Sequence, residues 1–286
     1  MRSVFIAAFL LTSLVSWHPH NAGAQGSLAI PNYWDPQERV IKPNLKGIPR
    51  LRFLTVTDFP PFSFIDTDKR LVGFHVDLAR AICEELELID VCQIQAIPFE
   101  EQNAALADKN GEALISGLAI TNETRKTFTF SRPYFRLPAR FIARKTSRLS
   151  EPIEPLLKNR PVGIVAGTAH AAFARASFTD LQLRQFATVE DALAALKNNK
   201  IEAVFSDGLA LSFWIQNDLS SNNGTSCCEF AGGPYFSEAY FGRGLAIALP
   251  KEDVELKEGI DYALRSISEK GIFSELYLRY FPISLY

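Results

Sequence analysis

The chain has 286 residues and a formal net charge of −2, with 30 Lys and Arg against 32 Asp and Glu. This length allows one large or two medium-sized domains. The nearly balanced charge, with no long block of one sign, gives no support to a protein that binds nucleic acid or an anionic membrane surface.

The N-terminus has the pattern of a secretory signal peptide. Arg2 precedes an almost entirely apolar run at residues 4–15, and Ala22-Gly23-Ala24 forms a small-residue cleavage site. That run is too short to anchor the chain in a bilayer, and no other stretch approaches the length needed. We therefore expect residues 1–24 to be removed as a signal peptide and the mature protein, from Gln25, to be exported.

Four cysteines remain in the exported chain: Cys83, Cys92, Cys227 and Cys228. An oxidising compartment permits disulfides. A bond between Cys83 and Cys92 would fasten the end of a predicted helix to the next strand, whereas a bond between the two adjacent cysteines would be strained. Metal binding is the alternative, but neither His75 nor His170 lies at ligand spacing from a cysteine, so no metal is expected.

The first half of the chain alternates strand and helix patterns. Residues 25–50 are expected to form an irregular arm that packs on the body. A predicted strand at 51–56 leads into Pro60-Pro61, and two prolines force an extended loop that presents Phe59. Apolar periodicity then predicts a helix at 74–86, a strand at 91–97 and a helix at 100–107.

The segment from Ala113 to Tyr134 concentrates groups that suit an anion. A predicted buried strand stops at Ser116-Gly117, and Thr121 is a candidate N-cap for a short turn that carries Arg125. Free N–H groups at a helix start favour anions, and a guanidinium can hold a carboxylate through two hydrogen bonds. The sequence predicts a carboxylate site here; the alternative is an ordinary strand–turn–helix with a solvated arginine.

A second series of βα units follows a polar connector at 147–155. Strands are predicted at 162–165, 183–186, 203–205 and 245–249, with helices at 168–176, 188–198, 208–215, 252–269 and 272–280 and a loop at 218–234. Thr188 and Asp191 suit a capping box. The pattern predicts two α/β lobes. Ligands of such sheets bind at the carboxyl ends of the strands, where Phe59, Ser116, Thr168 and Asp207 can converge.

Six segments carry a resemblance to a known family: FPPFSFID (59–66), GFHVDLARAIC (73–83), ISGLAITNETRKTFTFSRPY (115–134), VGIVAGTAHAAF (162–173), EAVFSDGLAL (202–211) and GRGLAIALPKED (242–253). In this order they resemble periplasmic solute-binding proteins of the polar amino-acid type (family 3), the receptors of ABC importers. The resemblance spans residues 51–280. It implies an α/β, two-lobe periplasmic-binding-protein fold of type II, with lobe 1 at 51–140 and 243–286 and lobe 2 at 141–242. The two crossovers would fall near 139–145 and 236–242.

The resemblance also implies a set of ligand-binding positions: Phe59 and Phe99 as aromatic walls, Ser116, Gly117, Ala119 and Thr121 for a carboxylate, and Asp207 for an ammonium. Thr168, Ala169 and His170 match the loop of the second lobe that completes the carboxylate site in the family. Two departures from the family pattern stand out. The arginine that binds the carboxylate in the family lies where this chain has Thr124, one residue before Arg125. Ala169 replaces a common hydroxyl residue, and the neighbouring His170 is interpreted as a solvated residue at a helix start.

The function implied is that of a monomeric periplasmic receptor that binds a small amino acid or related zwitterion and delivers it to an ABC permease. No cofactor and no enzymatic activity are expected. One alternative is a periplasmic dehydratase or lyase of the same fold, similar to cyclohexadienyl dehydratases, although no general acid can be named for it. Another is a binding module that serves a sensor or a dehydrogenase.

Overall fold

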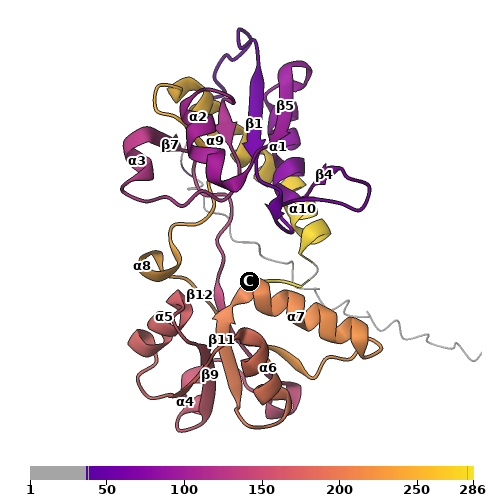
Figure 1. Ribbon diagram of the computed structural model, residues 1–286, viewed down its shortest axis with the longest axis vertical. Helices are drawn as coiled ribbons and strands as arrows, with labels where there is room; N and C mark the ends of the chain where they lie inside the picture. Colours follow the sequence, from indigo (N-terminus) through magenta and orange to yellow (C-terminus); the bar gives the residue numbers. More distant parts are fainter. Residues whose placement is uncertain (1–36, 38, 282) are drawn as a thin grey trace, which may run out of the picture.

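The structure is a computed structural model that describes residues 37, 39–281 and 283–286, so the predicted signal peptide lies outside the described residues. The described chain forms two α/β lobes stacked along the long axis of the molecule (Figure 1). The first sheet has the order β5 (Cys92–Ala96), β1 (Leu51–Thr55), β6 (Ala113–Leu114), β13 (Ala248–Pro250) and β7 (Phe128–Phe130). The second has the order β10 (Gln182–Phe186), β9 (Pro161–Val165), β11 (Ala203–Asp207), β8 (Ala139–Arg144) and β12 (Cys228–Tyr235). The predicted two-lobe fold of type II is confirmed.

A small third sheet joins β2 (Asp58–Phe59), β3 (Ser63–Ile65) and β4 (Leu71–Val72) on the first lobe. The helices are α1 (Phe74–Glu85), α2 (Gln102–Ala107), α3 (Thr124–Thr127), α4 (Ile153–Leu157), α5 (Ala169–Ser177), α6 (Val189–Lys197), α7 (Gly208–Ser221), α8 (Glu238–Phe241), α9 (Val254–Glu269) and α10 (Ile272–Tyr280). No helix among the described residues is long and apolar enough to cross a membrane.

Both main sheets are covered by helices on both faces, which explains their short, almost continuous apolar runs. In β1, Phe53 packs in the core under α1, α9 and α10, while its neighbour Leu54 packs in the core under α2. In β11, Phe205 faces the core that includes α5, and Val204 faces the core of α6 and α7. Successive strand residues therefore alternate between two cores, as the pleat requires.

Several local predictions are confirmed by the structure. The Thr188 hydroxyl caps α6 by accepting a hydrogen bond from Asp191 N at 3.1 Å. Cys83, in α1, is disulfide-bonded to Cys92, the first residue of β5, as expected, and Cys227 is bonded to Cys228. In the described part of the arm, residues 39–50 have no helix or strand, and the buried side chain of Leu45 packs close to Gly259 of α9.

Residues 218–234 do not form the predicted loop. Helix α7 continues to Ser221 and β12 begins at Cys228, so only a short connection remains. That connection is fixed by the buried carboxylate of Asp218, which accepts hydrogen bonds from Lys197 Nζ at 2.7 Å, Ser226 Oγ at 2.8 Å and Cys227 N at 3.0 Å. The connector predicted at 147–155 likewise contains the start of α4, whose Pro155 lies in the first turn, where a proline is tolerated.

The first crossover also lies earlier than expected. Residues 139–144 form β8, which pairs with β11 and β12 inside the second sheet, so the chain passes between lobes over residues 131–138. The second crossover runs antiparallel to it, with Phe135 paired to Leu245. Gly244 allows this close approach, because it has φ +106° and a Cβ there would lie 2.5 Å from the Phe135 carbonyl oxygen.

The C-terminal residues form a third connection between the lobes. Leu285 N donates a hydrogen bond to Tyr277 Oη of α10 at 2.9 Å, and its carbonyl oxygen accepts one from Arg140 Nη1 of β8 at 2.9 Å. Tyr286 Oη donates to the Arg136 carbonyl oxygen of the first crossover at 2.8 Å. The tail therefore ties the last helix of lobe 1 to the crossover and to lobe 2.

Candidate functional site

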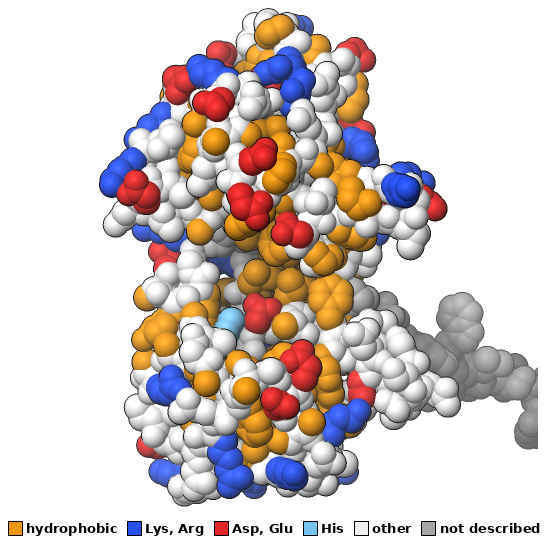
Figure 2. Space-filling model, viewed as in Figure 1, with side chains coloured by type: hydrophobic (Ala, Val, Ile, Leu, Met, Phe, Trp, Pro, Cys, Tyr) orange, Lys and Arg blue, Asp and Glu red, His pale blue; other side chains and the backbone are white. Residues whose placement is uncertain are grey.

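The carboxyl ends of the parallel strands in both lobes meet the crossovers. In lobe 1, the last residue of β6, Leu114, pairs with Ala248, the first residue of β13, where the second crossover arrives. In lobe 2, Asp207 pairs with Ala139, where the first crossover ends. The strand ends that carry Ser116 and Asp207 therefore lie at the edges of the two sheets that the crossovers join. Figure 2 shows the molecule hollowed at this level, with many hydrophobic side chains along the hollow.

On lobe 1, Phe59 and Gly117 lie against one another. The Phe59 ring stacks on Phe62 with centroids 4.7 Å apart. Gly117 has φ +78°, and a Cβ at this position would lie 2.9 Å from Phe59 Cε1. The turn after β6 thus needs glycine both for its backbone conformation and to admit the aromatic ring.

Ser116 is buried, and its hydroxyl donates a hydrogen bond to Gln102 Oε1 at 2.6 Å. A hydroxyl has one hydrogen to donate, so this hydrogen is already engaged within lobe 1. If a carboxylate binds at this strand end, the donors left to hold it are backbone N–H groups such as those of Gly117 and Ala119. Sequence reasoning missed Gln102, because its link to Ser116 depends on α2 packing beside β6.

The turn at Thr121 is held by hydrogen bonds among its own residues. Thr121 Oγ1 accepts a hydrogen bond from Thr124 N at 3.1 Å, and Thr124 Oγ1 donates to the Ala119 carbonyl oxygen at 2.8 Å. Thr121 therefore caps this turn, although α3 begins only at Thr124. Arg125 is exposed and its guanidinium carbon lies 6.0 Å from the centre of the Phe130 ring, within lobe 1. A role for Arg125 toward a ligand stays a prediction.

Phe99 stands apart from the other aromatic residues of the candidate site. It begins the 3-10 turn Phe99–Glu101 before α2 and is 55% exposed. An aromatic ring left this exposed is available to cover a ligand.

On lobe 2, Asp207 ends β11 and caps α7. Its Oδ1 accepts a hydrogen bond from Ala210 N at 2.8 Å, which leaves Oδ2 for other partners. Burial raises the pKa of the Asp207 carboxyl above its usual value, against the opposing effects of the Ala210 N–H and of His170. Thr168 caps α5 in the same way, accepting from Ala171 N at 3.1 Å and donating to the Val165 carbonyl oxygen at 2.8 Å. Its hydroxyl hydrogen is thus engaged.

His170 is not the solvated residue that the sequence suggested. Its ring is mostly buried, stacks on Phe241 of α8 with centroids 4.8 Å apart, and places Nε2 3.9 Å from Asp207 Oδ2. Burial lowers the pKa of His170, and the charge of Asp207 opposes this shift. A sequence pattern could not reveal this, because Phe241 and Asp207 reach His170 only through tertiary packing.

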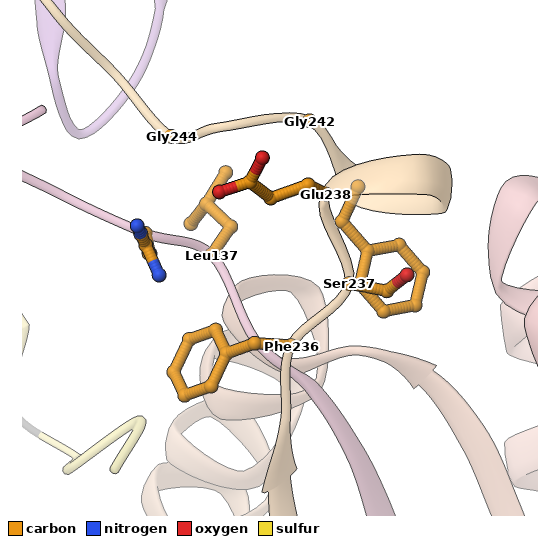
Figure 3. Close-up of a pocket in the computed structure, with 8 residues that line it drawn as sticks. Leu137, Phe236, Ser237, Glu238, Gly242 and Gly244 are labelled. Atoms are coloured by element: carbon orange, nitrogen blue, oxygen red, sulfur yellow. The ribbon is translucent and has the colours of Figure 1, made fainter.

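A pocket of about 170 Å³ lies between the two crossovers and α8 (Figure 3). Phe236 and Leu137 line it from the two crossovers, and Glu238 extends its carboxylate toward Leu137. Phe241, the ring on which His170 stacks, also lines it. Among the described residues, no group of three or more potential metal ligands comes together.

A family model describing the bacterial extracellular solute-binding proteins, family 3, matches residues 51–283. The chain belongs to this family. ABC transporter arginine-binding protein 1 of Escherichia coli is 28% identical over 82% of this chain and 91% of its own length. The lysine/arginine/ornithine-binding periplasmic protein of the same organism is 28% identical over 82% of this chain and 89% of its own.

Solved structures of other proteins share this fold. The L-cystine solute receptor of Neisseria gonorrhoeae, in its unliganded open conformation, superimposes with a TM-score of 0.68. The match covers 82% of this chain and 94% of the receptor, at 19% identity, and so it supports the fold alone.

Proposed function

We propose that the mature chain is the periplasmic receptor of an ABC importer and binds a small amino acid or a related zwitterion between its lobes. The observation that supports this most directly is the position of Asp207, at the crossover edge of the lobe 2 sheet. The strand end with Phe59 and Gly117 lies at the corresponding edge of lobe 1. The similar proteins of E. coli are named for binding arginine, lysine and ornithine.

Each lobe would hold one end of the ligand. The free carboxylate oxygen of Asp207 would take the ammonium, because an ion pair removed from water is strong. The turn from Ser116 to Thr121 would receive the carboxylate through backbone N–H groups, with Arg125 as a further cation. Phe59 and Phe99 would cover the side chain, and aromatic faces accept apolar or cationic groups.

Bending at the crossovers would then close the lobes over the ligand. The closed, monomeric receptor would dock on an inner-membrane permease, and no chemical step is assigned to it. The dehydratase alternative predicts that the purified protein converts prephenate to an aromatic product, and we expect no such absorbance change.

A thermal-shift screen of the mature protein tests the proposal. We expect at least one of L-arginine, L-lysine, L-ornithine, L-histidine and L-glutamine to raise Tm in a concentration-dependent way, because a ligand that binds only the folded state stabilises it. Putrescine lacks the carboxylate and succinate lacks the ammonium, so neither should match that shift. No shift with any amino acid, or an equal shift with either control, would refute the proposal.

A further inference from the structure

His170 Nε2 and Asp207 Oδ2 face one another, and Nε2 is an acceptor in the neutral tautomer that carries its hydrogen on Nδ1. Asp207 Oδ1 is occupied by Ala210 N, so Oδ2 faces the imidazole, with 3.9 Å between Oδ2 and Nε2. That separation is too long for a direct hydrogen bond between the two atoms. The imidazole also stacks on Phe241, with an angle of 20° between the rings, which restricts its orientation.

A single ammonium group fits between these two atoms. A nitrogen at about 2.9 Å from each of two acceptors 3.9 Å apart makes an angle of roughly 85° between the two bonds. The N–H bonds of an ammonium diverge at the tetrahedral angle, so each hydrogen bond need bend only slightly. A primary ammonium has three such donors, and the third stays available for another partner.

We propose that His170 is a ligand-binding residue and that Nε2 of its neutral imidazole shares the ammonium of the ligand with Asp207 Oδ2. This inference rests on the proposed function and names the part of the ligand that lobe 2 recognises. The chemical class it selects is a primary ammonium, since a quaternary ammonium has no N–H to offer to either acceptor.

A proton competes with the ligand for the same place. When His170 is protonated, its Nε2–H points at Asp207 and neutralises that carboxylate, so the ammonium of the ligand loses both partners. Binding to the protonated form must therefore release one proton from His170 to the buffer. Burial keeps the imidazole neutral at neutral pH, and the positive end of α5, in whose first turn it lies, disfavours the imidazolium further.

The other charged groups around His170 belong to the elements packed on α5, which include α8, β9 and β11. β11 contributes Asp207, and β9 contains no titratable residue. α8 contributes Glu238 and Tyr240, and the Glu238 carboxylate lies 3.4 Å from Arg243 Nε of the second crossover. On α5 itself, Arg175 lies in the last turn, at the opposite end from His170. Within the described residues, Asp207 is thus the charged group whose carboxylate lies close to the His170 ring.

Calorimetric titration from pH 7.5 to below the pKa of His170 tests the inference, using L-arginine or whichever amino acid of the screen gives the largest thermal shift. For the wild type we expect Kd to rise by up to about tenfold per pH unit once the pH falls below the pKa of His170. In His170→Gln, which cannot titrate, Kd should stay flat until Asp207 itself takes up a proton. Parallel pH profiles for the two proteins would overturn the inference and leave the proposed function intact, whereas no binding of any amino acid would overturn both.

Two further measurements separate a ligand contact from a structural role. His170→Phe keeps a ring to stack on Phe241 but has no acceptor, so we expect about tenfold weaker binding at pH 7.5 with an unchanged Tm. In the wild type, at a pH below the pKa of His170, titrations in buffers of different ionisation enthalpy should show release of a proton on binding, a result that needs no variant to fold. Zero protons released, or equal affinity for the Nα-trimethyl derivative of the same amino acid, would contradict the assignment.

Discussion

The two halves of the candidate site are built from different chemistry. Lobe 1 presents aromatic rings and a turn of small residues, with Phe59 packed on Gly117 and the Ser116 hydroxyl already bonded to Gln102. Lobe 2 presents an ionisable pair, Asp207 and His170, whose free atoms face one another. Lobe 1 therefore contributes an aromatic surface and backbone N–H donors, whereas lobe 2 contributes ionisable side chains whose charge depends on pH.

The histidines of the two lobes show the same contrast. His75 is fully buried in lobe 1, where Tyr134 Oη lies 2.7 Å from its Nε2, and burial lowers its pKa to about 3. His170 lies beside a carboxylate at the cleft. Both lowered pKa values make folding stability depend on pH, and His170 should in addition make binding depend on pH.

The largest expected effect is on lobe 2. Asp207→Asn should weaken amino-acid binding by about 3 kcal/mol, because it removes the charge that balances a desolvated ammonium. The melting temperature should hardly change, since asparagine also caps helices well. Calorimetry measures the first and a melting curve the second. Asp180→Asn removes an exposed carboxylate of the same lobe and is the matched control. Equal affinity in the two variants would remove Asp207 from the site.

The next effect concerns the disulfide of lobe 1, whose loss should lower the stability of the fold without changing ligand affinity. Replacing Cys83 and Cys92 together by alanine should lower the free energy of unfolding by about 2–3 kcal/mol, because a short closed loop is released in the unfolded chain. Urea denaturation measures this change. Ligand affinity should be unchanged at a temperature where the variant is folded. A large loss of affinity would show that the disulfide also determines the geometry of the binding site.

Acid should destabilise the protein through His75. The unfolded state takes up a proton on this residue below pH about 6.5, and the folded state does not until about pH 3, so stability falls as pH drops through this window. Between pH 6.5 and pH 5 the loss from this residue is about 2 kcal/mol. Urea denaturation at both pH values should show a smaller loss in His75→Gln than in the wild type, while His170→Gln should retain most of it. The reverse ranking would contradict the contrast between the lobes.

A smaller effect is expected at the turn after β6. Gly117→Ala forces a side chain into a positive φ and against the Phe59 ring, which should cost about 1–2 kcal/mol of stability and also weaken binding. Gly47→Ala is the control, because a Cβ there meets no atom within 4 Å. If the Gly117 variant melts and binds like the control, the fit between Phe59 and this turn is unimportant.

The smallest effect is expected at Phe99. Because this ring is 55% exposed, Phe99→Ala should leave Tm unchanged, yet it should weaken binding by about 1 kcal/mol through the lost aromatic cover. Ile89→Ala, at a residue 48% exposed and just before β5, is the comparison. Titration calorimetry on both variants distinguishes an aromatic wall of the cleft from an ordinary exposed apolar residue.

The features that the sequence predicted well depend on neighbours along the chain. Thr188 caps α6 through a residue three positions away, and the buried runs of β1 and β11 stand out because both faces of each sheet are covered. Features that depend on distant partners were missed. β12 has three small residues in its centre, and it forms a strand because it pairs with β8. The His170 ring is positioned by stacking on Phe241, which lies 71 residues further along the chain. Of the ionisable pair in the candidate site, the sequence therefore pointed to Asp207 alone.

A crystal structure of the protein saturated with the amino acid that gives the largest thermal shift would show whether the two lobes hold opposite ends of the ligand. We expect closed lobes with the ammonium nitrogen within hydrogen-bond distance of Asp207 Oδ2 and His170 Nε2, and the carboxylate against the turn from Ser116 to Thr121. A ligand held by one lobe alone, or bound with its carboxylate toward Asp207, would contradict it.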